Sequence, residues 1–101
     1  MNEEYENIIK AVASAADLTS AQVLSNRRFA EVKDARWIAV KVLHDTGVYP
    51  SRISAIMGMS VRHVNTILYQ IEVKLSQNDR FLCQILAKTR KKLGQNSEIS
   101  I

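Results

Sequence analysis

The chain has 101 residues, of which 47% are hydrophobic, and it carries a net charge of +4 at pH 7. This length allows one domain whose core needs no disulfide or metal, and the hydrophobic content excludes general disorder. With three Gly, one Pro and a single cysteine, the composition favours long helices over a turn-rich β fold and excludes an internal disulfide.

The charge is unevenly distributed along the chain. Residues 1–20 hold one basic and four acidic residues, residues 21–74 hold eight and four, and residues 75–101 hold five and two. This basic excess indicates a polyanionic partner, although an unevenly charged solvated surface gives the same balance. The acidic opening lacks the apolar core of a secretory signal, and no apolar run approaches the ~20 residues that cross a bilayer. We therefore expect a cytoplasmic protein without a membrane partner.

The first half of the chain predicts two helices and a long third one. An apolar stripe with acidic residues at its start predicts a helix from about Glu3 to Ala16. Thr19 or Ser20 is the expected cap of a short helix that reaches Leu24. From about Val32 to Thr46, more than half of the helix circumference is apolar, and the following glycine ends the helix. This third helix is predicted to lie at the centre of the fold.

Basic side chains in this half each allow two interpretations. Arg27 and Arg28 lie at the tip of the loop before the third helix, where like charges are solvated or reach into a narrow DNA minor groove. Lys33, Arg36 and His44 fall within about a quarter-turn of one another on the third helix. Such a strip suits contacts with DNA phosphates, and a solvated helix face has the same composition.

The stretch PSRISAIMGMSVRHVNTILY, residues 50–69, has the spacing of a helix-turn-helix. Ile53 and Met57 share one face of a short helix, and Gly58 supplies the positive φ of a sharp turn. Ser60 occupies the N-cap position of a second helix that continues to about residue 76. The alternative is a purely structural corner in an all-α core.

The second helix of this stretch has one apolar and one polar face. Its apolar face carries Val64, Ile67 and Ile71, and its polar N-terminal face has the composition that lies in a DNA major groove. Arg bonds guanine and Asn bonds adenine in a bidentate manner, so Arg62 and Asn65 are the expected base contacts. Further candidate base contacts are Ser60, Val61, His63 and Thr66.

A last helix is predicted from a cap at Asn78 or Asp79 to its end at Gly94. Basic residues near its end, which complement the helix dipole, are Lys88, Arg90, Lys91 and Lys92. Residues 95–101 are expected to form a flexible tail. The predicted organisation is a single all-α domain over residues 1–94, a bundle of five to six helices that contains the helix-turn-helix.

Four stretches resemble the C-terminal DNA-binding domain of the bacterial replication initiator DnaA, a member of the Trp-repressor-like group. They are NIIKAVASAADLTSAQVLSNRR, DARWIAVKVL, ISAIMG and ILYQIEVKLSQNDRFLCQIL, and they cover about residues 5–93 in the order of the family. The resemblance implies that Arg28 enters the minor groove and that Arg36 lies near the DNA backbone. The family begins its recognition helix with an Arg-Asp-His-Thr-Thr run, whereas this chain has MSVRHVNT and a turn one residue shorter. The bases that the family recognises therefore cannot be assumed for this chain.

Catalytic patterns are missing from the sequence. His44 and His63 lack the spacing of metal ligands, no carboxylate pair stands out, and no G-x-x-x-x-G-K-[ST] loop occurs, so the ATP-hydrolysing module of the initiator is absent. We expect no enzyme, no metal and no cofactor.

The sequence predicts a stand-alone protein that binds double-stranded DNA sequence-specifically, as a regulator of replication or transcription. Arg27 and Arg28 are then minor-groove contacts, and Lys33, Arg36 and Lys41 are phosphate contacts. A palindromic target would require a homodimer. The alternative is a protein-interaction adaptor that keeps the fold without binding DNA.

Overall fold

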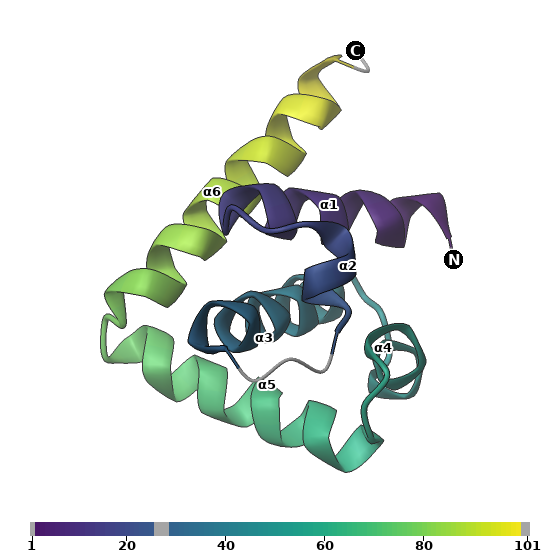
Figure 1. The fold of residues 1–101 in the computed structure, drawn as a ribbon, viewed down its shortest axis with the longest axis vertical. Helices are drawn as coiled ribbons and strands as arrows, with labels where there is room; N and C mark the ends of the chain where they lie inside the picture. The colour runs from purple at the N-terminus through teal and green to yellow at the C-terminus, as the bar shows by residue number, and fades with distance from the viewer. Residues whose placement is uncertain (1, 26–28, 100–101) are drawn as a thin grey trace.

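The computed structural model describes residues 2–25 and 29–99, with side chains up to residue 94. Within these ranges the chain forms a bundle of six helices (Figure 1). They are α1 (Glu3–Ala15), α2 (Ser20–Val23), α3 (Ala30–Asp45), α4 (Pro50–Met57), α5 (Val61–Ser76) and α6 (Arg80–Ile99). The predicted all-α fold is confirmed. Among these six helices none combines the length and the apolar character that crossing a membrane requires.

Local capping determines where several helices begin. Thr19 and Gln22 exchange hydrogen bonds of 3.1 and 2.8 Å in a capping box at the start of α2. The Asp79 carboxylate accepts the backbone N–H of Leu82 at 3.1 Å and so caps α6. Asn78, the alternative predicted cap, instead adopts a left-handed φ of 60° in the turn before α6.

The central position of α3 is confirmed. This helix contacts each of the other five helices, and it lies between α1 and α5, which share no contact within the described ranges (Figure 1). Its buried residues are Val32, Ala35, Trp37, Ile38, Ala39, Val40, Lys41, Val42 and Leu43. The helix begins at Ala30, two residues before the predicted start. Because α3 is buried on most sides, it positions α5 on one side of the molecule and α1 on the other.

The prediction that Gly94 ends the last helix is wrong. Helix α6 continues to Ile99, and the left-handed glycines of the described chain are Gly47 and Gly58 only. A glycine inside a helix costs roughly 1 kcal/mol relative to Ala, but it leaves the hydrogen-bond ladder intact. Residues 95–99 of the predicted tail are therefore helical, and residues 100 and 101 lie outside the described chain.

Candidate nucleic-acid interface

Helices α4 and α5 meet at a tight corner. Gly58 ends α4 with φ 64°, and a Cβ there would meet no atom within 4 Å, so backbone conformation rather than space favours glycine. Met59 donates its backbone N–H to the Ser54 carbonyl at 3.2 Å, and the Ser54 hydroxyl donates to the Met59 carbonyl. The Ser60 hydroxyl accepts the backbone N–H of His63 at 3.0 Å and caps α5. The predicted roles of Gly58 and Ser60 in the turn are confirmed.

The inner face of α5 is anchored in the core. Val64, Ile67 and Ile71 are at most 1% exposed, as are Ile53 and Met57 of α4. These five side chains belong to one cluster with the apolar residues of α3. The buried face therefore holds α5 in a single rotational setting, which determines the residues that point to solvent.

The outer face of α5 is accessible and carries little charge. Its exposed residues are Val61, Arg62, His63, Asn65, Thr66, Tyr69, Gln70, Glu72, Val73 and Ser76. Arg62 and Glu72 are the residues of this set with a formal charge at pH 7, and Glu72 forms an ion pair with Lys41. Tyr69 is 75% exposed, and Val61 and Val73 are 42% and 40% exposed. A face that is merely solvated is typically rich in Lys and Glu. This face instead offers amide, hydroxyl and guanidinium groups together with apolar patches, which are the groups that read base edges and thymine methyls.

All six residues predicted to contact bases are exposed at the corner and the first turns of α5. The Thr66 hydroxyl donates to the Arg62 carbonyl at 3.0 Å, so its proton is already engaged within the helix. No hydrogen bond or ion pair within the described residues engages the side chains of Arg62 and Asn65. These two side chains are therefore available for an external partner.

Lys41 is engaged inside the protein and not on its surface. Its Nζ atom lies 2.5 Å from Glu72 Oε1 of α5 and 3.4 Å from Asp45 Oδ2, and its side chain is 11% exposed. Burial by itself lowers the pKa of Lys41, but the hydrogen bond with Glu72 and the charges of Asp45 and Glu72 outweigh it, so that the pKa is raised. The phosphate contact predicted for Lys41 stays a prediction, although two carboxylates already neutralise the ammonium at the α3–α5 interface.

Arg36 likewise has an internal role. Its guanidinium donates to the backbone carbonyls of Val23 at 2.9 Å, Ser25 at 2.6 Å and Met57 at 2.9 Å. Burial lowers the pKa of Arg36, which nevertheless stays charged at neutral pH. The phosphate contact predicted for Arg36 stays a prediction, while the structure shows that the side chain joins the end of α2 to the last residue of α4, directly before the corner.

Arg27 and Arg28, the predicted minor-groove contacts, lie outside the described residues. The structure does describe Ser25, two residues before Arg27. The Ser25 carbonyl and the Met57 carbonyl accept hydrogen bonds from the same guanidinium. The chain therefore enters residues 26–28 from a point that is tied to the α4–α5 corner.

Lys33 is exposed, and it shares an aromatic ring with a second lysine, Lys74. The Nζ atoms of Lys33 and of Lys74 on α5 each lie 5.0 Å from the centre of the Trp37 ring, as in a cation–π contact. Beside Lys33, burial and then the charge of Asp79 raise the pKa of Asp34. The phosphate contact of Lys33 stays a prediction. Lys74 was missed by the sequence analysis, because no local pattern links it to a tryptophan 37 residues earlier in the chain.

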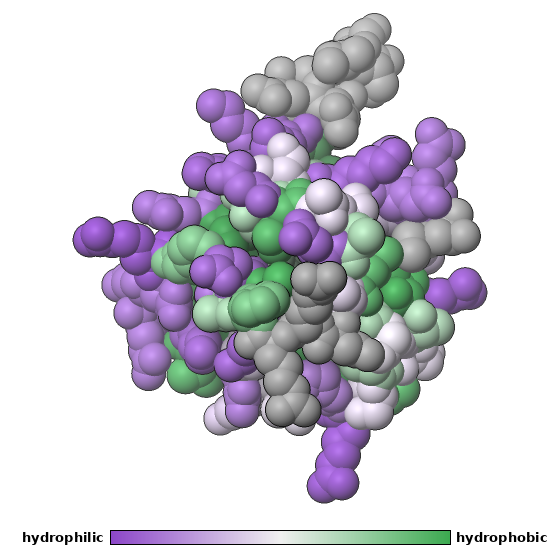
Figure 2. All heavy atoms as spheres, in the orientation of Figure 1, coloured by the Kyte–Doolittle hydropathy of each residue, from purple (hydrophilic) through white to green (hydrophobic). Residues whose placement is uncertain are grey.

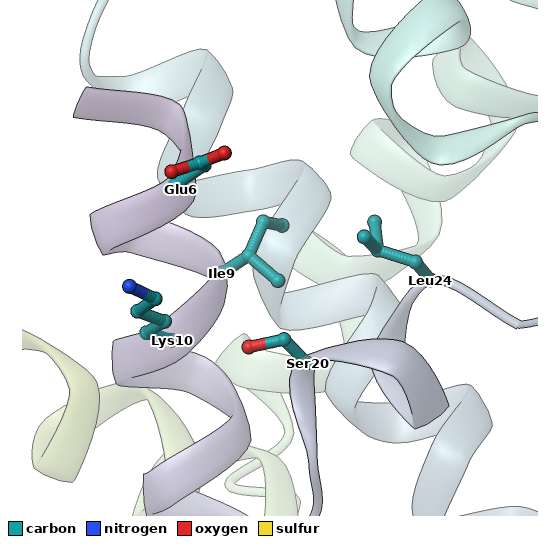
Figure 3. A pocket seen from close by; sticks show the side chains of 5 residues that line it. All are labelled: Glu6, Ile9, Lys10, Ser20 and Leu24. Atoms are coloured by element: carbon teal, nitrogen blue, oxygen red, sulfur yellow. The ribbon is translucent and has the colours of Figure 1, made fainter. Parts of the chain in front are cut away.

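A hollow of about 330 Å³ lies between α1 and α2, away from α5. Ile9 and Leu24 lie opposite each other across it, and the charged ends of Glu6 and Lys10 do not converge on a common point (Figure 3). The described residues also contain no group of three or more His, Cys, Asp or Glu side chains that could hold a metal. The hollow therefore offers no acid–base pair or ligand set from which to build a reaction.

No protein-family model matches this chain, and no curated protein matches it. The geometry of α4, the corner and α5 is therefore the basis for a functional proposal.

Proposed function

We propose that this protein binds double-stranded DNA sequence-specifically, with α4 and α5 acting as a helix-turn-helix and the N-terminal half of α5 lying in the major groove. The observation that carries the proposal is the outer face of α5, which is accessible and rich in groups that read bases, and whose two formal charges are Arg62 and the Lys41-paired Glu72. A major groove about 12 Å wide admits one α-helix. Arg62 and Asn65 are the proposed base contacts, since neither side chain has a partner in the described chain.

The resemblance to the DNA-binding domain of DnaA supports the same ligand. In this proposal Arg27 and Arg28 contact the minor groove and Lys33 contacts a phosphate, whereas Arg36 and Lys41 support the fold instead. The role is control of replication or transcription in the cytoplasm. An adaptor function is the second candidate, because Tyr69 and Val73 on the outer face also suit a protein interface.

The test is a binding selection from randomised duplex DNA at two salt concentrations, followed by affinity measurements on the enriched site. We expect one enriched motif and a log–log salt slope of about −0.9 per phosphate contacted. Arg62→Ala should cost about 1–3 kcal/mol on this site and relax the preference at one base pair. Lys10→Ala is the matched control, because Lys10 is exposed on α1, which does not contact α5.

Each other outcome has a definite meaning. Salt-sensitive binding without an enriched sequence motif would show that the protein binds DNA non-specifically. If Arg62→Ala retains the wild-type specificity, the assignment of α5 as the reading helix is wrong. If the wild-type protein binds no DNA at either salt concentration, the proposal fails and the adaptor function takes its place.

A further inference from the structure

A basic surface lies on α6 where this helix passes the C-terminal end of α1. Lys88, Lys91 and Lys92 line an open hollow of about 400 Å³ together with Ser14, Ala15 and Asp17. Hydrophilic side chains gather over the upper left of the face drawn in Figure 2, where α6 passes the end of α1. We call Lys88, Lys91 and Lys92 the α6 lysine cluster.

The α6 lysine cluster is unfavourable in the isolated chain. Lys91 and Lys92 lie three and four positions after Lys88 on one helix, so Lys88 and these two lysines repel one another. None of them forms an ion pair within 4 Å in the described chain. Attraction to the negative end of α6 does not explain them either, because α6 continues to Ile99 and the dipole effect is confined to the last turn.

The end of α1 offsets only part of this charge. The C-terminus of α1 carries the equivalent of about −0.5 charge, and Asp17 adds one negative charge at the same hollow. The hollow therefore retains a net positive charge of about +1.5 after the three lysines are offset by Asp17 and the end of α1. A positive surplus of this size in an open hollow favours an anionic ligand, and lysine binds phosphate as a point charge.

The cluster lies beside the end of α1, a helix that does not contact α5. Helix α3 lies between α1 and α5, and α6 passes α1 at the end of the molecule opposite α5 (Figure 1). The molecule measures 38 × 30 × 23 Å. A straight duplex that holds α5 in its major groove therefore does not reach the α6 lysine cluster.

We propose that the α6 lysine cluster binds the phosphate backbone of a second DNA segment, so that one protein molecule bridges two duplexes. This inference depends on the proposed function for the first duplex. The second contact is independent of sequence, because lysines that touch only phosphates carry no base readout.

A bridging assay tests the inference. A duplex with the selected site is fixed to beads, full-length protein is added, and capture of a labelled soluble duplex without the site is measured. We expect capture by the wild-type protein, at least tenfold less capture by the variant Lys88→Gln/Lys91→Gln/Lys92→Gln, and near wild-type capture when the same lysines are changed to arginine. Affinity for the bead-bound site should change by less than about twofold in the glutamine variant, because the cluster lies outside the α5 interface.

The failures of the two proposals can be told apart. Wild-type protein that binds the bead-bound site but captures no second duplex would overturn the bridging inference alone. Equal capture by the glutamine variant would also overturn it, provided that circular dichroism shows the same helix content. Wild-type protein that does not bind the beads would overturn the proposed function, and the bridging inference with it.

Discussion

Replacing Arg36 with Ala separates a structural role from a DNA-binding role for this side chain. The change removes three hydrogen bonds from a charged donor to the carbonyls of Val23, Ser25 and Met57. Such bonds contribute about 1.5–3 kcal/mol each when buried. Because Arg36 is half-buried and water can replace part of each bond, we take ~1 kcal/mol per bond. The expected loss in the free energy of unfolding is therefore about 3 kcal/mol.

Urea unfolding, followed by circular dichroism and by the fluorescence of Trp37, measures this loss. With an m-value of about 1.5 kcal/mol/M, the midpoint should fall by about 2 M. Arg36→Lys keeps the charge but not the planar donor geometry, so an intermediate loss is expected. Arg52→Ala is the matched control, since Arg52 is exposed on α4, and it should change stability by less than about 0.5 kcal/mol.

One result would refute the structural role of Arg36. If Arg36→Ala unfolds within about 1 kcal/mol of the wild type and yet loses DNA affinity with a smaller salt slope, the side chain contacts a phosphate after all. If it loses stability while Arg36→Lys retains the wild-type salt slope, the internal hydrogen bonds are its main function.

Three further predictions concern stability. Burial and then the charge of Asp79 raise the pKa of Asp34 above its ordinary value of 3.8. The protonated Asp34 carboxyl therefore favours the folded state. This contribution to stability is complete below pH 3.8 and is lost as the pH rises through the folded-state pKa of Asp34. Asp34→Asn should therefore raise the melting temperature at pH 7 and leave it nearly unchanged at pH 3; an equal shift at both pH values would contradict this reasoning. The Thr89 hydroxyl is fully buried and has no hydrogen-bond partner among the described residues, so Thr89→Val should stabilise the protein by about 1 kcal/mol, and a lower melting temperature would show that the hydroxyl is in fact bonded. Thermal unfolding should also distinguish two glycines: Gly94→Ala should stabilise by about 0.5–1 kcal/mol inside α6, whereas Gly58→Ala should destabilise by about 1 kcal/mol or more at its left-handed φ. A destabilising Gly94→Ala would mean that α6 does not continue through this residue.

The sequence by itself determined the features that depend on neighbours within a few residues. The left-handed Gly58, the Ser60 cap and the apolar face of Val64, Ile67 and Ile71 were all predicted, and the structure confirms them. The exposed face of α5 followed from the same periodicity, because a helix that buries one side leaves the other to solvent. Helix ends were less certain. Gly94 carries the usual signal for termination, yet the helical hydrogen bonds continue past it.

The tertiary structure decided which charged side chains remain available. Arg36, Lys41 and Lys33 all read as phosphate contacts in the sequence, but only Lys33 remains exposed. The partners of Arg36 lie 13, 11 and 21 residues away, and the Glu72 partner of Lys41 lies 31 residues away. Periodicity shows which side of a helix is polar, but it does not show which other helix packs against that side. The same limit applies to the α6 lysine cluster, because the sequence shows neither the end of α1 beside it nor the position of α3 between α1 and α5.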